Sequence, residues 1–264
     1  MKKDQHVIAC VESAADAETV LSCAKHCAER LNHKGIILLN VSPEGTDNSW
    51  IKDYGVPYVG LHGDWKTAIG GLPTAFGGIL AVTMVNHSAP RASITHPSTL
   101  LRTFGECKIA YLTVGGQWQD DRSLWPRAVA MTVDHRRESK EKLIWASYFA
   151  RFFGSRLTMA RPAYKDEDLL RRQNENIRFL DKFLTSLGVD YKEATISNHT
   201  LQSPDITALA ELSPDLLVSL GTDRRDLDVG DWLLGSPEKR LLCRSNGTPI
   251  LFLNQRDDLY VLCD

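Results

Sequence analysis

The chain has 264 residues, of which 43% are apolar and 24% charged, and it carries a net charge of −2. This length permits one large domain or two ordinary ones, and the composition is that of a globular protein. The balanced charge argues against nucleic-acid or anionic-membrane partners, and no apolar stretch has the form of a signal peptide or a membrane span. We therefore expect a cytoplasmic protein.

In the first half, five short apolar runs predict strands at residues 6–11, 35–41, 56–61, 79–85 and 108–114. Residues 16–32 predict a first helix. The second helix is reduced to about 48–54, and the third contains Gly70, Gly71, Pro73, Gly77 and Gly78, so it must be short or irregular.

The second half has clearer signals. Strands are predicted at 128–133, 156–162, 191–196, 216–220 and 248–253, and helices at 138–153, 166–187, after Ser203 and after Ser236. Gly154 ends the first of these helices, and Ser-Pro pairs open the last two as N-cap and first helical residue. A further edge strand is expected within 255–264. Such alternation requires a mostly parallel sheet covered on both faces.

The order strand, loop, capped helix and strand occurs twice, at 79–114 and at 216–253. A polar stretch at 115–126, with Gly115-Gly116 and Asp120-Asp121-Arg122, separates the two copies. The sequence therefore predicts two related domains, at 1–117 and 126–264.

This pattern resembles the universal stress protein family in its tandem form. The residues that carry the resemblance are Val133-Asp134, Gly221, Gly235-Ser236-Pro237-Glu238 and Thr248-Pro249-Ile250-Leu251. The resemblance implies an α/β fold of two flavodoxin-like (adenine nucleotide alpha hydrolase-like) open parallel five-stranded sheets, of strand order 3-2-1-4-5, packed as a pseudo-dimer through their fifth strands. It also implies a stress-response regulatory or binding role without robust catalysis. The resemblance implies a protein partner that it does not identify, and it allows a homodimer in addition to the pseudo-dimer within the chain.

Some members of the family bind ATP through a loop written Gly-two-Gly-nine-Gly-Ser/Thr. The resemblance thus marks Asp134, Gly221, Gly235 and Ser236 as cofactor-binding residues for ATP or another adenine nucleotide, in the second domain only. A weak ATP-binding or ATP-hydrolysing switch is the alternative function. Capping of the following helix is an equally complete explanation of Ser236.

The chain also departs from that loop pattern. Arg224 replaces the second glycine, the gap to Gly235 is one residue too long, and four aspartates lie within 223–231. Arg136 and Arg137 follow the first strand and, with Arg224 and Arg225, oppose this acidic charge, so the sign of the local field stays open.

In the first half Glu12 replaces the aspartate, no glycine follows Val85, and His96-Pro97 replaces Gly-Ser. Close backbone approach to a phosphate is lost there, so we expect no nucleotide in this half.

No catalytic or metal-binding set is predicted. The six cysteines lack paired C-x-x-C spacing, and Cys23 and Cys27 lie on an apolar helix stripe, which favours packing over a metal site with Cys10 and His26. His87 and His96 flank the first-half loop without a metal-binding spacing. An adenine-nucleotide enzyme of the pyrophosphatase type is a distant alternative, because Asp134-His135-Arg136-Arg137 is not its Ser-Gly-Gly loop.

Overall fold

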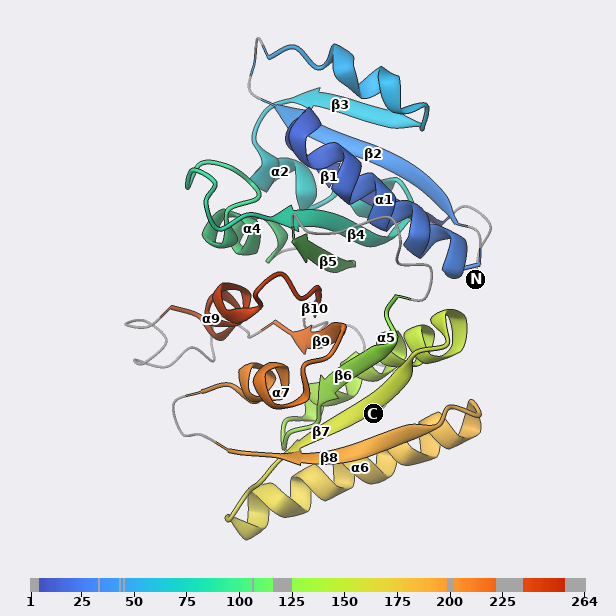
Figure 1. Ribbon diagram of the computed structural model, residues 1–264, viewed down its shortest axis with the longest axis vertical. Coiled ribbons are helices and arrows are strands. Elements are labelled where there is room, and N and C mark those ends of the chain that lie inside the picture. Colours follow the sequence, from blue (N-terminus) through green and yellow to red (C-terminus); the bar gives the residue numbers. More distant parts are fainter. Residues whose placement is uncertain are drawn as a thin grey trace. The chain divides into compact units, whose positions relative to one another are not determined.

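The computed structural model describes residues 5–32, 34–42, 44, 46–105, 107–115, 125–198, 202–221 and 235–254. These residues form two compact units, which we call unit 1 (within 5–115) and unit 2 (within 125–254). Each unit is built on a parallel sheet with helical connections, as Figure 1 shows. In the described part of the chain, no helix combines the length and the apolar character that a membrane span requires.

Unit 1 starts with β1 (His6–Val11), α1 (Ala14–Arg30), β2 (Gly35–Ser42), the 3-10 helix η1 (Ser49–Tyr54) and β3 (Tyr58–His62). It continues with α2 (Trp65–Ile69), α3 (Leu72–Ala75), β4 (Gly78–Val85), α4 (Pro97–Phe104) and β5 (Ala110–Gly115). The parallel pairings give the order β3-β2-β1-β4-β5. Val7 to Val11 of the central strand are fully buried, as expected for a strand covered on both faces. The helix α1 packs on β1 and on both of its neighbours.

Unit 2 starts with β6 (Ala128–Thr132), the 3-10 helix η2 (Arg137–Glu141), α5 (Lys142–Tyr148), the π-helix η3 (Phe149–Phe153) and β7 (Arg156–Pro162). It continues with α6 (Glu167–Ser186), β8 (Tyr191–Ile196), α7 (Pro204–Leu212), β9 (Leu216–Leu220), α9 (Pro237–Arg244) and β10 (Ile250–Leu253). The parallel pairings give the order β10-β9-β6-β7-β8.

In both units the chain therefore builds its first three strands outward in one direction and then returns to the other side of the first strand. In unit 2 this reversal makes β6 and β9 neighbours, with Ala130 beside Leu217 and Met131 beside Val218. The carboxyl ends of two strands at such a reversal are where open α/β sheets bind ligands. The α/β class with parallel sheets, predicted from the sequence, is confirmed, whereas packing as a pseudo-dimer stays a prediction.

One predicted helix is wrong in detail. Residues 138–153 do not form a single α-helix but η2, α5 and η3 in succession. The first turn is tighter because the Ser139 N–H bonds to the Arg136 carbonyl, which directs the Ser139 side chain to Asp134. The π-turn accompanies the burial of Phe149 and Phe153, whose ring centroids lie 4.8 Å apart. Gly154 ends this segment as predicted.

Smaller differences concern strand ends and the tail. The strand predicted at 248–253 starts only at Ile250, because the Thr248 N–H closes a turn on the Ser245 carbonyl. The edge strand expected within 255–264 lies outside the described residues.

Candidate functional site

A cavity of about 300 Å³ lies in unit 2 where the chain reverses, at the carboxyl ends of β6, β7 and β9. This volume is at the lower end of the range of small-molecule sites. Its wall comes from the segment after β6, the segments after β7 and β8, the start of α7, the end of β9 and the first two turns of α9. The lining residues are Asp134, His135, Arg136, Tyr164, Asn198, Gln202, Ser203, Pro204, Asp205, Ser219, Leu220, Pro237, Glu238 and Leu241.

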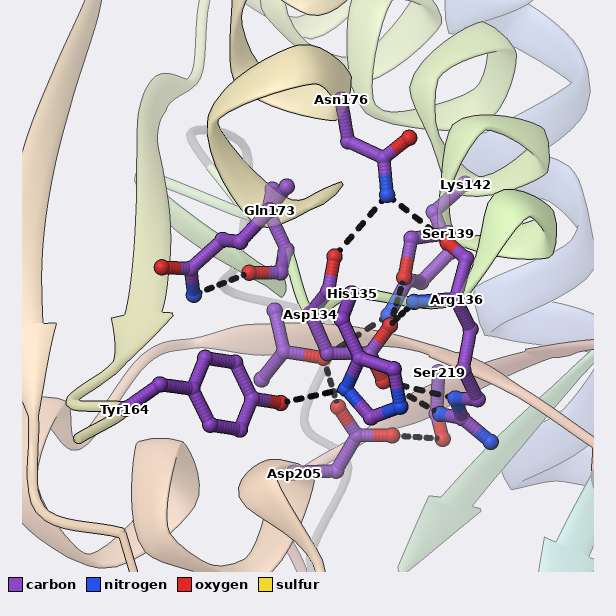
Figure 2. Close-up of polar contacts among 12 residues, drawn as sticks. Asp134, His135, Arg136, Ser139, Lys142, Tyr164, Gln173, Asn176, Asp205 and Ser219 are labelled. Carbon is purple, nitrogen blue, oxygen red and sulfur yellow. Dashed lines mark hydrogen bonds and ion pairs between the residues drawn. The ribbon is translucent and has the colours of Figure 1, made fainter. Parts of the chain in front are cut away.

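Asp134 follows β6 and is tightly enclosed by polar groups (Figure 2). Its Oδ2 accepts hydrogen bonds from Nε and Nη2 of Arg136, each at 2.7 Å. Its Oδ1 accepts from the Arg136 backbone N–H at 2.9 Å and from the Ser139 hydroxyl. Burial would raise the pKa of this carboxyl, but the charges of Arg136 and Lys142 and these hydrogen bonds lower the pKa to about 2.

A second polar chain runs through the core beside this group. Lys142 of α5 is fully buried, and its Nζ donates to the Thr132 hydroxyl at 2.7 Å. The hydroxyls of Thr132 on β6 and Ser219 on β9 each donate to one carboxylate oxygen of Asp205 on α7. Burial lowers the pKa of Lys142, while the charges of Asp205 and Asp134 oppose this shift. This series of hydrogen bonds thus joins two strands and two helices through the buried carboxylate of Asp205 (Figure 2).

Two amides of α6 hold the backbone after β6 in place. The Gln173 Nε2 donates to the carbonyls of Val133 and Pro162 at 3.0 and 3.1 Å. The Asn176 Nδ2 donates to the carbonyls of Asp134 and Arg136 at 2.9 and 2.8 Å. Because both side chains are buried, these bonds satisfy carbonyls that water cannot reach.

His135 and Tyr164 form an aromatic pair in the cavity wall. The His135 Nδ1 and the Tyr164 hydroxyl are 3.0 Å apart, and the two rings meet edge to face with their centroids 5.4 Å apart. Burial and the Asp134 charge raise the pKa of Tyr164 to about 12. The phenol therefore stays protonated at neutral pH.

Of the four residues that the sequence marks for the cofactor, Asp134 lines the cavity. Gly221 follows the lining residue Leu220, and a Cβ atom at Gly221 would lie 3.0 Å from the Asn254 Oδ1. Gly235 has φ +83°, a left-handed conformation that favours glycine. Ser236 caps α9, since its hydroxyl accepts from the Lys239 N–H at 3.3 Å. A nucleotide-binding role for these residues stays a prediction, and the loop 222–234 lies outside the described residues.

At the corresponding place in unit 1, two parts of the chain are joined by hydrogen bonds. Glu12 follows β1, and its carboxylate accepts from the Ser93 hydroxyl and, at 3.3 Å, from the Ile94 N–H. Ile94 and Thr95 are buried, and the Asn86 N–H bonds to the Thr95 carbonyl at 2.9 Å. The segment between β4 and α4 is thus fixed against the end of β1. That the first half takes no nucleotide stays a prediction.

The histidines and cysteines singled out in the sequence have ordinary surroundings. His96 caps α4, its Nδ1 accepting from the Ser98 N–H at 3.2 Å. Cys10, Cys23 and Cys27 are fully buried, in agreement with a packing role. Within the described ranges, no three His, Cys, Asp or Glu side chains are arranged to hold a metal ion.

Several residues of the site were not predicted, namely Lys142, Tyr164, Gln173, Asn176, Asp205 and Ser219. The sequence carries a signal for some of them. Thr132 and Ser219 are polar residues in otherwise apolar strands, and Gln173 and Asn176 interrupt the apolar face of α6. Of the two arginines after β6, Arg136 lines the cavity and Arg137 does not.

No protein-family model and no curated protein matches this chain. Solved structures do resemble it over nearly its whole length. A universal stress protein from Archaeoglobus fulgidus has a TM-score of 0.67 and 11% identity, over 96% of this chain and 97% of its own. The chain has the universal stress protein fold. A putative universal stress protein from Pseudomonas aeruginosa has a TM-score of 0.64 and 15% identity, over 97% and 95% of the two chains.

A functionally unknown protein from Pseudomonas aeruginosa is similar to the same degree, with a TM-score of 0.63, 15% identity and coverage of 97% and 94%. Because these matches span almost all of both chains, the universal stress fold extends over both units, as the tandem form requires. At such low identity the likeness concerns the fold and assigns no ligand.

Proposed function

We propose that this chain is a cytoplasmic regulatory protein of the tandem universal stress type, which acts in a stress response by binding rather than by robust catalysis. Two features support the proposal. The fold over both units is that of universal stress proteins, and the cavity of unit 2 is large enough for a small molecule. The protein that receives the signal is unassigned.

The observation that carries the proposal is the position of the cavity. It lies at the reversal point between β6 and β9, where a ligand can reach strand ends and helix starts together. The contacts in unit 1 favour one binding site per chain, in unit 2. At the corresponding place in unit 1, Glu12 binds the segment between β4 and α4 instead. We infer that the ligand is an adenine nucleotide and that unit 2 alone binds it.

Isothermal titration with Mg-ATP, ADP and AMP tests this function, and phosphate release measured on the same samples separates binding from hydrolysis. A variant that fills the cavity, Gln202→Trp, should abolish binding. Glu12→Ala should leave the titration unchanged, because Glu12 belongs to unit 1. Absence of heat and of thermal stabilisation at millimolar concentrations of all three nucleotides would refute the nucleotide assignment.

Ser236 variants separate helix capping from ligand contact. Ser236→Asp keeps a side chain that caps α9 but places a negative charge beside a phosphate, whereas Ser236→Ala removes the cap. If Ser236 contacts phosphate, the Asp variant loses binding while its stability stays near that of the wild type. If both variants bind the nucleotide as tightly as the wild type, Ser236 only caps the helix.

A further inference from the structure

Arg136 presents a fixed guanidinium to the cavity of unit 2. Its Nε and Nη2 are held by the Asp134 Oδ2, and its backbone N–H is held by the Oδ1 of the same residue. The Arg136 side chain is 36% exposed, against 3% for Asp134. A guanidinium has five N–H donors. Among the residues that the structure describes, Asp134 binds two of those of Arg136, and the other three can meet a ligand. The cation is therefore oriented before any ligand arrives.

Asp134, by contrast, has little acceptor capacity left. Each of its carboxylate oxygens already accepts two hydrogen bonds, from Arg136 and Ser139 on one oxygen and from Arg136 alone on the other. A carboxylate offers about four acceptor positions in all. A ligand hydroxyl could bond to Asp134 only by displacing Arg136 or Ser139, which would break a buried charge-assisted hydrogen bond.

The other charged groups near the cavity are less suited than Arg136 to bind a ligand. Asp205 lines the cavity, but both of its oxygens accept from hydroxyls, with the buried cation of Lys142 nearby. Lys142 is fully buried and is not part of the wall. The network contains two cations, Arg136 and Lys142, and only Arg136 lines the cavity, where its remaining N–H groups can donate to a ligand. Glu238 also lines it and would repel an anion, so an anionic group belongs beside Arg136.

We propose that Arg136 is the ligand-binding cation of unit 2 and takes an oxyanion, a carboxylate or phosphate, of a small molecule. Asp134 and Ser139 act as positioning residues that hold the guanidinium. The inference builds on the proposed binding function and identifies the ligand group that this site recognises. A planar fork of donors matches the oxygens of carboxylate and phosphate, and such paired contacts are among the strongest polar ones.

The test compares AMP with adenosine, which differ by the phosphate alone. We expect AMP to bind at least about ten-fold more tightly, a difference of about 1.4 kcal/mol. Arg136→Gln should remove this preference and leave adenosine affinity unchanged, while Arg136→Lys keeps part of it. Arg137→Gln is the matched control, because Arg137 adjoins Arg136 and does not line the cavity.

Asp134→Asn distinguishes positioning from direct contact. If Asp134 acts through Arg136, the variant weakens AMP binding and leaves adenosine binding unchanged. If Asp134 contacts the nucleoside itself, both ligands lose affinity to the same extent, and the proposal is overturned. Equal binding of AMP and adenosine to the wild type, unaffected by Arg136→Gln, also overturns it while leaving nucleotide binding intact.

A direct probe makes the inference independent of nucleotides. In ¹⁵N-labelled protein, the Nε–H of Arg136 is shielded by Asp134 and should give a slowly exchanging NMR signal, identified by its loss in Arg136→Gln. Inorganic phosphate or benzoate should shift this signal, and benzamide, which is uncharged, should not. A shift without any nucleotide binding supports the oxyanion site and refutes the nucleotide assignment. No shift with phosphate, benzoate or AMP refutes the oxyanion site.

Discussion

Lys142 offers the sharpest test of the buried network in unit 2. Its ammonium is fully buried and donates at 2.7 Å to Thr132, which in turn donates to Asp205. The Lys142→Met variant keeps the length and apolar contacts of the side chain but removes its charge. The Asp205 carboxylate then keeps its two hydroxyl partners and loses the opposite charge of Lys142.

The expected cost follows from two opposing terms. Removing one partner of a buried charge pair typically costs 3–5 kcal/mol, because the other charge stays buried without compensation. Methionine, being uncharged, does not have to be desolvated on folding, which reduces this cost. The same desolvation of the buried ammonium lowers the pKa of Lys142. We therefore expect the free energy of unfolding of unit 2 to fall by about 3 kcal/mol.

Amide hydrogen exchange of β6 and β9 measures this free energy inside unit 2 and does not require the whole chain to unfold in one step. Lys140→Met is the matched control, since Lys140 lies on the same segment and is only partly buried over the Phe179 ring. It should cost about 0.5 kcal/mol. In the double variant Lys142→Met with Asp205→Asn, at least about 1 kcal/mol should be recovered. The coupling between Lys142 and Asp205 would be refuted if the destabilisations of the two single variants simply added in the double variant. It would also be refuted if Lys142→Met cost no more than Lys140→Met.

Three further predictions concern carboxylates and an amide. The pKa of Asp134 falls from 3.8 to about 2 on folding, so this group contributes about 2 kcal/mol above pH 4 that is lost as the pH falls through 2. Urea titrations should therefore show Asp134→Asn destabilised at pH 7 and equal to the wild type below pH 2; a constant difference would contradict the assignment. In unit 1, Glu12→Gln should speed exchange of the Ile94 amide, while Glu18→Gln, at an exposed position of α1, should not; unchanged Ile94 exchange would argue against the contact. Asn176→Ala removes the hydrogen bonds to the Asp134 and Arg136 carbonyls, of which, within the described residues, only the Arg136 carbonyl keeps a second partner, the Ser139 N–H; it should cost about 2 kcal/mol in the same urea titrations at pH 7, and a loss below about 0.5 kcal/mol would contradict this.

The α/β class was predictable because apolar runs and helix caps are local signals. The central strand β1 is a continuous apolar run, since both of its faces are covered, and Ser203-Pro204 and Ser236-Pro237 mark helix starts by their own chemistry. The irregular helix after β6 was not predictable in this way. Its first turn depends on a contact between Ser139 and Asp134, which a helical periodicity does not reveal.

The site was predictable in place and only partly in composition. Asp134 was marked because the residues after the first strand of this half resemble the universal stress protein pattern, and it does line the cavity. Asp205 was missed because its partner Thr132 lies 73 residues away in the chain. Lys142 is 10 residues from the same threonine, but each charged residue alone resembles an ordinary surface charge on a helix. Long-range polar pairs leave no periodic signal.

The two acidic residues after β1 and β6 explain why the related units differ. Glu12 reaches across the chain reversal of unit 1 and accepts from Ser93, 81 residues away, so that the β4–α4 segment stays against the end of β1. Asp134 is one methylene shorter and bonds within its own segment, to Arg136 and Ser139. Its carboxylate therefore holds no part of the β9 side, and the space between β6 and β9 remains a cavity. In unit 1 the acid joins two strand ends, and in unit 2 it orients the cation that we expect to meet the ligand.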